Sequence, residues 1–149
     1  MQIDEIDRRI LRALTGDGRL PNTQLAERVG LSPSASLRRV QDLERRGIIT
    51  GYRAVLDPAA LGRGFLAYVT VGLSEHTKAA QVRFEQAVAG FDEVRECHNI
   101  TGTVEYLLRV EAEDLAAYKQ FHTDKLGTVD GVNRLTTHVV MGSPKDERG

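Results

Sequence analysis

The segment Gly30-Leu31-Ser32-Pro33 restricts the fold of this chain more than any other part of its 149 residues. Serine is a favourable residue before a helix, and proline suits the first helical position because its missing N–H is not needed there. A helix is therefore predicted to begin at Pro33. Because glycine commonly ends a helix, a preceding helix is predicted to stop at Gly30. Two helices joined by so short a turn form a helix-turn-helix.

Three helices are predicted over the first 47 residues. Apolar side chains between residues 3 and 14 recur at helical spacing and predict a first helix that ends at Gly16-Asp17-Gly18. Asn22 is the predicted N-cap of the second helix. The third helix is predicted to end at Gly47. Its predicted buried side carries Leu37, Val40 and Leu43.

The exposed side of the third helix is predicted to be cationic. Residues 1–62 hold ten arginines, no lysine and eight acids, a net charge of +2, whereas residues 63–149 carry a net charge of −3. Between Ser32 and Arg53 there are five arginines and two acids. A basic patch on an otherwise acidic chain is typical of a surface that meets phosphate. A solvated helix face and a dimerisation module are the alternatives.

A helix-turn-helix places its second helix in the major groove of DNA, where the planar fork of arginine donates two hydrogen bonds to guanine. Arg38 and Arg39 point about 100° apart on a helix, so one is expected to read a base and the other to hold a phosphate. Residues 48–56 predict a β-hairpin, or wing, from which Arg53 would reach a phosphate. The predicted DNA-binding residues are Ser32, Ser34, Ser36, Arg38, Arg39 and Arg53.

Residues 64–149 alternate between strand and helix patterns in the order βαββαβ. The predicted strands cover residues 65–73, 94–100, 104–110 and 132–141. The two predicted helices end at Gly90 and Gly127. This order is the ferredoxin-like plan, an antiparallel sheet with two helices on one face. The strands hold more apolar residues than two helices would cover, so two sheets are expected to pack in a homodimer, unless the excess forms a thick internal core.

The chain is thus predicted to be an α+β protein with two small domains, a winged helix-turn-helix at 1–56 and a ferredoxin-like domain at 64–149, joined by a linker at 57–63. Domains of this size gain stability from partners, so an oligomer is expected. No apolar run approaches the ~18 residues that a membrane helix needs. Charges interrupt residues 1–12, where a signal peptide would be apolar, so a cytoplasmic location is expected. The single cysteine, Cys97, excludes an internal disulfide.

No motif for catalysis, metal binding or a cofactor is present in the sequence. The four histidines are scattered, without the HxH or HExxH spacing of metal sites, and no nucleophile stands beside a base. Cys97 and His98 are neighbours on a predicted strand, where adjacent side chains point to opposite faces. The chain is therefore expected not to be an enzyme and to need no metal or cofactor.

Several segments resemble the Lrp/AsnC family of feast/famine transcription regulators, over essentially the whole chain. These segments are Ile6–Leu11, Leu25–Pro33, Arg38–Glu44, Gly47–Ile49 and Val104–Val110. The resemblance implies a protein that binds double-stranded DNA and carries a RAM-type, or AsnC-type, ligand-sensing domain. It also implies homodimers that assemble into tetramers or octamers and bind an amino acid or a related effector between dimers.

The resemblance places the effector against the turn between the second and third predicted strands. In the family this turn reads Thr-Gly-acid-any-Asp-aromatic; here Thr103 replaces one acid and Glu105 replaces the aspartate. Backbone groups near Gly102 would bind a carboxylate and Glu105 would pair with an ammonium. A hairpin turn with no ligand is the alternative. The predicted effector-binding residues are Thr101, Gly102, Thr103, Glu105 and Thr137.

Two other functions fit the same two-domain plan. Siroheme decarboxylases resemble it as well, and an enzyme of that kind would hold a large tetrapyrrole in a cleft. An adaptor whose helix-turn-helix has lost its affinity for DNA would bind only the small molecule. Salt dependence distinguishes a regulator from the adaptor, because the affinity of a regulator for DNA falls steeply with salt concentration, whereas an adaptor shows no binding. A tetrapyrrole that absorbs visible light in the purified protein would favour the enzyme.

Overall fold

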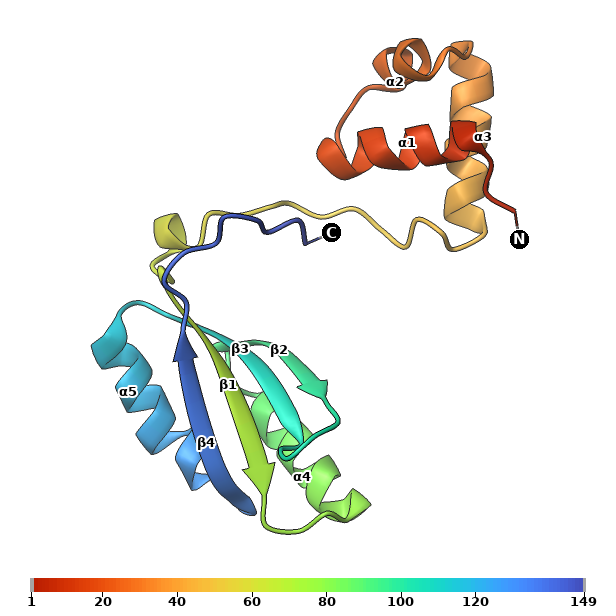
Figure 1. Cartoon of the computed structure of the whole chain (residues 1–149). Helices are drawn as coiled ribbons and strands as arrows, with labels where there is room; N and C mark the ends of the chain where they lie inside the picture. The colour runs from red at the N-terminus through yellow and green to blue at the C-terminus, as the bar shows by residue number, and fades with distance from the viewer. Residues whose placement is uncertain (1, 149) are drawn as a thin grey trace. The chain divides into compact units, whose positions relative to one another are not determined.

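A computed structural model describes residues 2–148 and divides the chain into two compact units (Figure 1). Among the described residues the first unit comprises residues 2–55 together with Glu147 and Arg148, and the second runs from Leu56 to Asp146. Met1 and Gly149, the outer limits of the two predicted domains, lie outside the described residues. Each unit has a hydrophobic core of its own.

The first unit consists of three helices, α1 (Glu5–Gly16), α2 (Asn22–Val29) and α3 (Pro33–Arg45). The predicted start of α3 is confirmed, because Ser32 is its N-cap and Pro33 its first residue. The predicted cap of α2 is wrong by one residue, since Pro21 takes the N-cap position and Asn22 is already helical. The core of this unit consists of Ile10, Leu20, Leu25, Val29 and Leu43.

The hairpin predicted for residues 48–56 is absent, since none of these residues lies in a strand. The backbone N–H groups of Ile48 and Ile49 both donate to the carbonyl of Leu43 at the end of α3, so they are not available to a β-ladder. Residues 50–57 beyond them are all exposed, and Val55 is 92% exposed. A two-stranded hairpin without packing on one face is at best marginally stable, which accounts for the irregular backbone.

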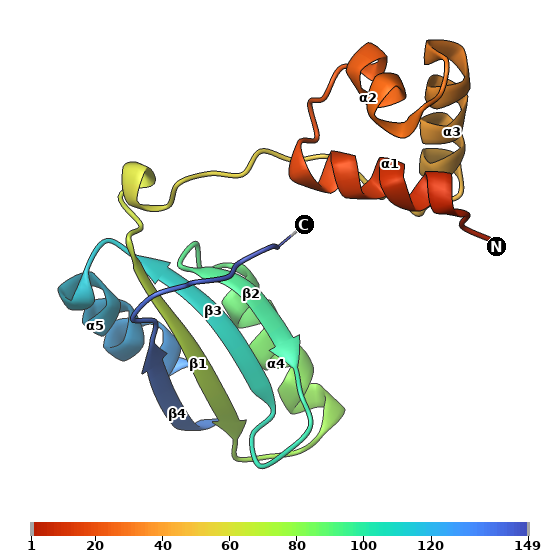
Figure 2. The ribbon, with the colours of Figure 1, turned by 45° about the horizontal axis from the view of Figure 1, so that its top comes forward.

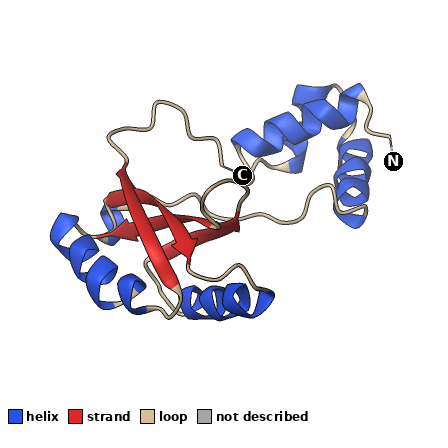
Figure 3. Ribbon diagram, turned by 60° about the horizontal axis from the view of Figure 1, so that its bottom comes forward, coloured by secondary structure: helices blue, strands red, loops and turns tan. Residues whose placement is uncertain are grey.

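The second unit has the predicted order βαββαβ. It contains η1 (Ala59–Leu61), β1 (Phe65–Leu73), α4 (Lys78–Ala89), β2 (Val94–Asn99), β3 (Tyr106–Ala112), α5 (Leu115–Asp124), η2 (Leu126–Thr128) and β4 (Val132–Val139). The strand order in the sheet is β2-β3-β1-β4, with every neighbouring pair antiparallel (Figure 2). Both helices cover the same face (Figure 3), so the predicted ferredoxin-like plan is confirmed.

The two faces of the sheet differ in composition, because successive residues of a strand point to opposite sides. The helix-covered face carries buried apolar residues of β1 and β3, such as Val69, which lies opposite Leu108. The other face, called here the open face, is mostly polar. The residues of the open face are Leu66, Tyr68, Thr70, Glu96, His98, Leu107, Arg109, Glu111, Arg134, Thr136 and His138.

This division corrects the argument for an apolar excess on the sheet. Val69, Val71 and Val139 belong to the helix-covered face, so they cannot serve a second sheet. The apolar or aromatic strand residues of the open face are Leu66, Tyr68 and Leu107. A charged group lies in the middle of that face: the Arg109 guanidinium is 3% exposed and contacts Tyr68 and Glu111.

Candidate nucleic-acid interface

The turn between α2 and α3 is held by three local features. Gly30 ends α2 with φ +73°, in the left-handed region that favours glycine. The hydroxyl of Ser32 accepts a hydrogen bond from the N–H of Ala35 at 3.2 Å, which satisfies one of the free donors at the start of α3. The side-chain amide of Asn22 donates to the carbonyl of Pro33 at 2.8 Å. These contacts join the beginning of α2 to the beginning of α3.

The inner side of α3 differs from the predicted one. Leu43 is fully buried and Val40 packs beside it, as predicted, but Leu37 is 46% exposed. The buried position in that turn of the helix is Ser36, whose side chain is 0% exposed. The prediction that Ser36 contacts DNA is therefore wrong. The outer side of α3 carries Ser34, Leu37, Arg38, Gln41 and Arg45, at the three- and four-residue spacing of one helix face.

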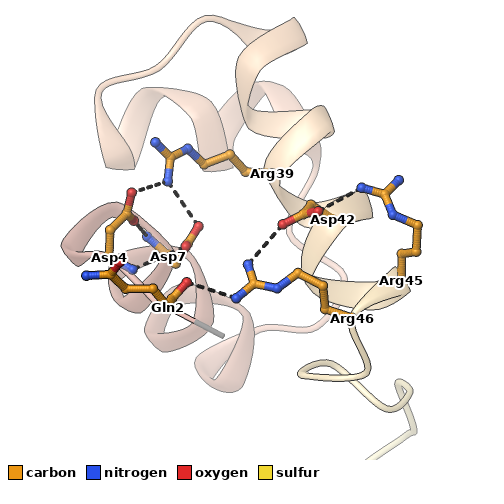
Figure 4. Close-up of polar contacts among 7 residues, drawn as sticks. All are labelled: Gln2, Asp4, Asp7, Arg39, Asp42, Arg45 and Arg46. Carbon is orange, nitrogen blue, oxygen red and sulfur yellow. Dashed lines mark hydrogen bonds and ion pairs between the residues drawn. The ribbon is translucent and has the colours of Figure 1, made fainter.

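Arg39 does not lie free on the outer side, because two carboxylates of the N-terminal segment hold it (Figure 4). Its Nη1 donates to Asp4 Oδ2 at 2.6 Å and to Asp7 Oδ1 at 3.1 Å. The prediction that Arg39 meets DNA needs correction, since the side chain ties α3 to α1. We call Arg39, Asp4 and Asp7 the Arg39 latch.

The electrostatics of the Arg39 latch follow from this geometry. The hydrogen bond from Arg39, followed by the one from the backbone of Asp7, holds the pKa of Asp4 below its ordinary value. The same contact with Asp4, and then the contact with Asp7, raises the pKa of Arg39. Both groups are therefore charged in the pH range in which DNA-binding proteins work. Asp7 is the more buried acid, with 10% of its side chain exposed.

A second group of contacts holds the last turn of α3. Arg46 donates to Asp42 at 3.0 Å and to the carbonyl of Gln2 at 2.8 Å, while Arg45 donates to Asp42 at 2.7 Å (Figure 4). Arg46 and then Arg45 lower the pKa of Asp42. Thus two of the five arginines counted between residues 32 and 53 neutralise an acid of their own helix.

Arg38 has no hydrogen-bond or ion-pair partner among residues 2–148, and its side chain is exposed on α3. Ser34 is exposed beside Ser32, whose hydroxyl already caps the helix. Arg53 is exposed on the irregular segment after α3. Of the predicted DNA-binding residues, Ser34, Arg38 and Arg53 therefore remain available to a ligand. Sequence reasoning missed the exposed Leu37 on the same face, although its spacing from Ser34 and Gln41 was visible.

The predicted effector residues do not all lie together. Thr101, Gly102 and Thr103 form an exposed turn between β2 and β3, with Gly102 at φ +121°. Thr137 is on β4, which lies on the other side of β1 from β3. Its hydroxyl is 2.5 Å from the hydroxyl of Tyr118 on α5. The structure thus separates Thr137 from the turn and gives it a contact with a covering helix.

Glu105 is already engaged within its own unit. Its Oε2 accepts a hydrogen bond from the N–H of Leu73 at 2.7 Å, and its Oε1 lies 2.6 Å from Nδ1 of His76. The carboxylate therefore joins the β2–β3 turn to the end of β1. An ammonium group would have to share Glu105 with His76, a neighbour that lies 29 residues earlier and that sequence reasoning missed.

A cavity of about 310 Å³ lies between α4 and β2. Its walls include Glu85, Cys97 and Tyr106, and the hydroxyl of Tyr106 donates a short hydrogen bond to Glu85. Burial, together with this carboxylate, raises the pKa of Tyr106. None of the predicted effector residues lines this cavity.

Two family models match the chain. One, described as "Winged helix-turn-helix DNA-binding", covers residues 3–50, and the other, described as "Lrp/AsnC ligand binding domain", covers residues 66–149. The leucine-responsive regulatory protein of Escherichia coli K12 is 41% identical over 143 residues, which are 96% of this chain and 87% of that protein. The chain belongs to the Lrp/AsnC family. It is a transcriptional regulator with a helix-turn-helix DNA-binding domain and a ligand-binding domain.

Solved structures of Lrp/AsnC proteins have the same fold. A transcriptional regulator from Neisseria meningitidis, in complex with L-Met, superposes with a TM-score of 0.92 at 36% identity, covering 97% of this chain and 94% of that one. The feast or famine regulatory protein of M. tuberculosis, complexed with L-methionine, gives a TM-score of 0.83 at 31% identity, with 99% and 98% covered. The predicted family and fold class are thus confirmed.

Other classes of site receive no support from the described part of this Lrp/AsnC protein. Within residues 2–148 no three His, Cys, Asp or Glu side chains gather in a way that would hold a metal ion. None of the described helices combines the length and the apolar character needed to cross a membrane. The relatives reported above are regulators rather than enzymes.

Proposed function

We propose that this regulator binds operator DNA by placing the outer side of α3 in the major groove. The observation that carries the proposal is the unpaired, exposed Arg38 on a helix whose orientation is held by the Arg39 latch. A free guanidinium on this face suits the two acceptors of a guanine, O6 and N7. Ser34 and Gln41 would contact neighbouring base edges or phosphates, and Arg53 would contact a phosphate.

We further propose that the functional unit is a cytoplasmic homodimer that assembles into tetramers or octamers. The domain limits proposed from the sequence, 1–56, 57–63 and 64–149, would give each subunit one DNA-binding module and one assembly module. A symmetric dimer presents two α3 helices, so its operator would hold two half-sites about 34 Å apart, or a multiple of one helical turn. The open face of the sheet, with Leu66, Tyr68 and Leu107, is the surface proposed for pairing.

The proposed effector is an amino acid or a similar small molecule. Two structural neighbours were solved with methionine, and the exposed turn at Thr101, Gly102 and Thr103 offers backbone groups to a carboxylate. Glu105 would then receive the ammonium group, in exchange for His76. Binding would favour one assembly state over another and thereby change how the α3 helices are presented to DNA.

The decisive experiment is operator binding by the wild type and by Arg38→Ala over a range of salt concentrations. The operator would be obtained by selecting bound fragments from the source genome. We expect Arg38→Ala to weaken binding by about 1–3 kcal/mol, the value of one bidentate base contact. Arg83→Ala, which removes an exposed arginine of α4 in the other unit, is the matched control and should leave operator binding unchanged. Salt-independent or undetectable binding by the wild type would refute the proposed function.

A further inference from the structure

At two successive residues of α3 a polar side chain is buried and an apolar side chain is exposed, the reverse of the usual pattern. Ser36 is fully buried and its hydroxyl has no hydrogen-bond partner within residues 2–148, whereas Leu37 is 46% exposed. A rotation of the helix by one residue, about 100°, would bury the leucine and return the serine to water. Burial of an unpaired hydroxyl together with exposure of a large apolar side chain is unfavourable on both counts.

Contacts of the residues that follow this pair in α3 prevent that rotation. Val40 and Leu43 pack into the core of the first unit, and Leu43 is fully buried. The Arg39 latch, one residue before Val40, holds the same helix to Asp4 and to Asp7 of α1 (Figure 4). The exposed position of Leu37 is therefore set by the scaffold. Local departures from the apolar-inside pattern are expected at functional sites.

Leu37 lies within the surface proposed to enter the major groove. It is the fifth residue of α3, three residues after Ser34, next to Arg38 and four residues before Gln41. The N-terminal residues of such a helix are the ones that reach base edges. In the major groove the apolar group available to a leucine is the C5-methyl of thymine.

We propose that Leu37 is a specificity-determining residue that reads the methyl group of one thymine in each half-site. The inference rests on the proposed function, because it requires α3 to lie in the major groove. Ser34, Arg38 and Gln41 would supply polar contacts around this methyl, and Leu37 would exclude water from it. A base pair without the methyl would leave the leucine against a polar edge.

The test replaces thymine by deoxyuridine, which lacks only the methyl group, at one position of the selected operator at a time. The affinities of the full-length wild type and of Leu37→Ala are measured by fluorescence anisotropy. For the wild type we expect a loss of roughly fourfold at one position per half-site, the value of one buried methyl-sized group. Leu37→Ala should bind the thymine and uracil forms of that position alike, so the two changes should not add.

Two variants control for effects on folding and on the rest of the surface. Leu37→Met keeps an apolar tip and should retain the preference for thymine. Leu115→Ala removes a leucine that is 63% exposed on α5, in the other unit, and should leave the preference unchanged.

Wild-type indifference to uracil at every position would overturn the inference while leaving the proposed function standing. If Leu37→Ala weakened binding to the thymine form and to the uracil form by the same factor relative to the wild type, the preference for thymine would persist. The leucine would then be assigned to a protein contact, and the inference would also be overturned. Failure of the wild type to bind any operator would overturn both.

Discussion

Removal of the Arg39 side chain should loosen α1 while leaving the electrostatic contribution to DNA binding intact. In Arg39→Ala the carboxylate of Asp7, 10% exposed, loses its charged partner and keeps only the N–H of Asp4, at 3.3 Å. A buried acceptor that loses its partner costs about 1–3 kcal/mol, and the remaining donor places the expected loss in the lower half of that range. The local free energy of opening of α1 should fall accordingly.

Hydrogen exchange of the full-length protein measures this change directly, because amides of α1 exchange through local opening. A loss of about 1–2 kcal/mol corresponds to amide exchange that is roughly 5 to 30 times faster in α1. Asp7→Asn removes only the Arg39–Asp7 ion pair and leaves the contact of Arg39 with Asp4, so it should give a smaller increase. Arg38→Ala, which removes an unpaired exposed side chain, should change protection by less than about 0.5 kcal/mol.

DNA binding by the same variants provides the second half of the test. A lysine or arginine that contacts a phosphate contributes about one unit to the slope of log K against log salt. Because the carboxylates of the latch hold Arg39, Arg39→Ala should leave this slope unchanged even if affinity falls through misplacement of α3. Unchanged protection of α1 together with a slope smaller by about one would refute the latch and restore Arg39 as a phosphate contact.

Three further outcomes are expected. Arg53→Ala should reduce the salt slope by about one while affecting all DNA sequences similarly, as measured by anisotropy titrations on operator and random DNA. Ser32→Ala should destabilise the start of α3 by about 1 kcal/mol, seen as faster amide exchange there, because the cap on Ala35 is lost. The lowered pKa of Asp4 means that its contribution to stability is fully present above its ordinary value of 3.8 and is lost as the pH falls through the lower folded value. The difference in α1 protection between wild type and Arg39→Ala should therefore shrink below pH 3.8, and a constant difference would contradict this role of Asp4.

Local signals in the sequence were sufficient for most of the fold. Ser32 and Pro33 defined the start of α3, and glycines marked the ends of helices, because caps act within a few residues. The order βαββαβ followed from periodicity, and the antiparallel sheet with both helices on one face followed from the known plan. The hairpin predicted after Gly47 was wrong because local preference did not decide the structure there. Ile48 and Ile49 favour strands in isolation, but their N–H groups donate to a carbonyl at the end of α3.

The candidate DNA surface was less predictable, because it depends on contacts distant in sequence. Arg38 and Arg39 are adjacent residues of the same type, so composition and local pattern do not show which of them is free to bind DNA. The difference comes from Asp4 and Asp7, more than 30 positions earlier, which bind Arg39. Periodicity assigned Leu37 to the core because it assumes that apolar side chains point inwards. The two faces of the sheet, by contrast, could have been separated from the sequence by odd and even positions of each strand.

The buried guanidinium of Arg109 has a consequence for assembly. Its Nη atoms bond Tyr68 and Glu111 of the same subunit, and Glu96 lies 3.6 Å from its Nε. Water has thus already been removed from this charge when a single chain folds. A second sheet that approached the open face would need to strip little further hydration from it, so the polar composition of that face is a weaker barrier to association than its formal charges suggest.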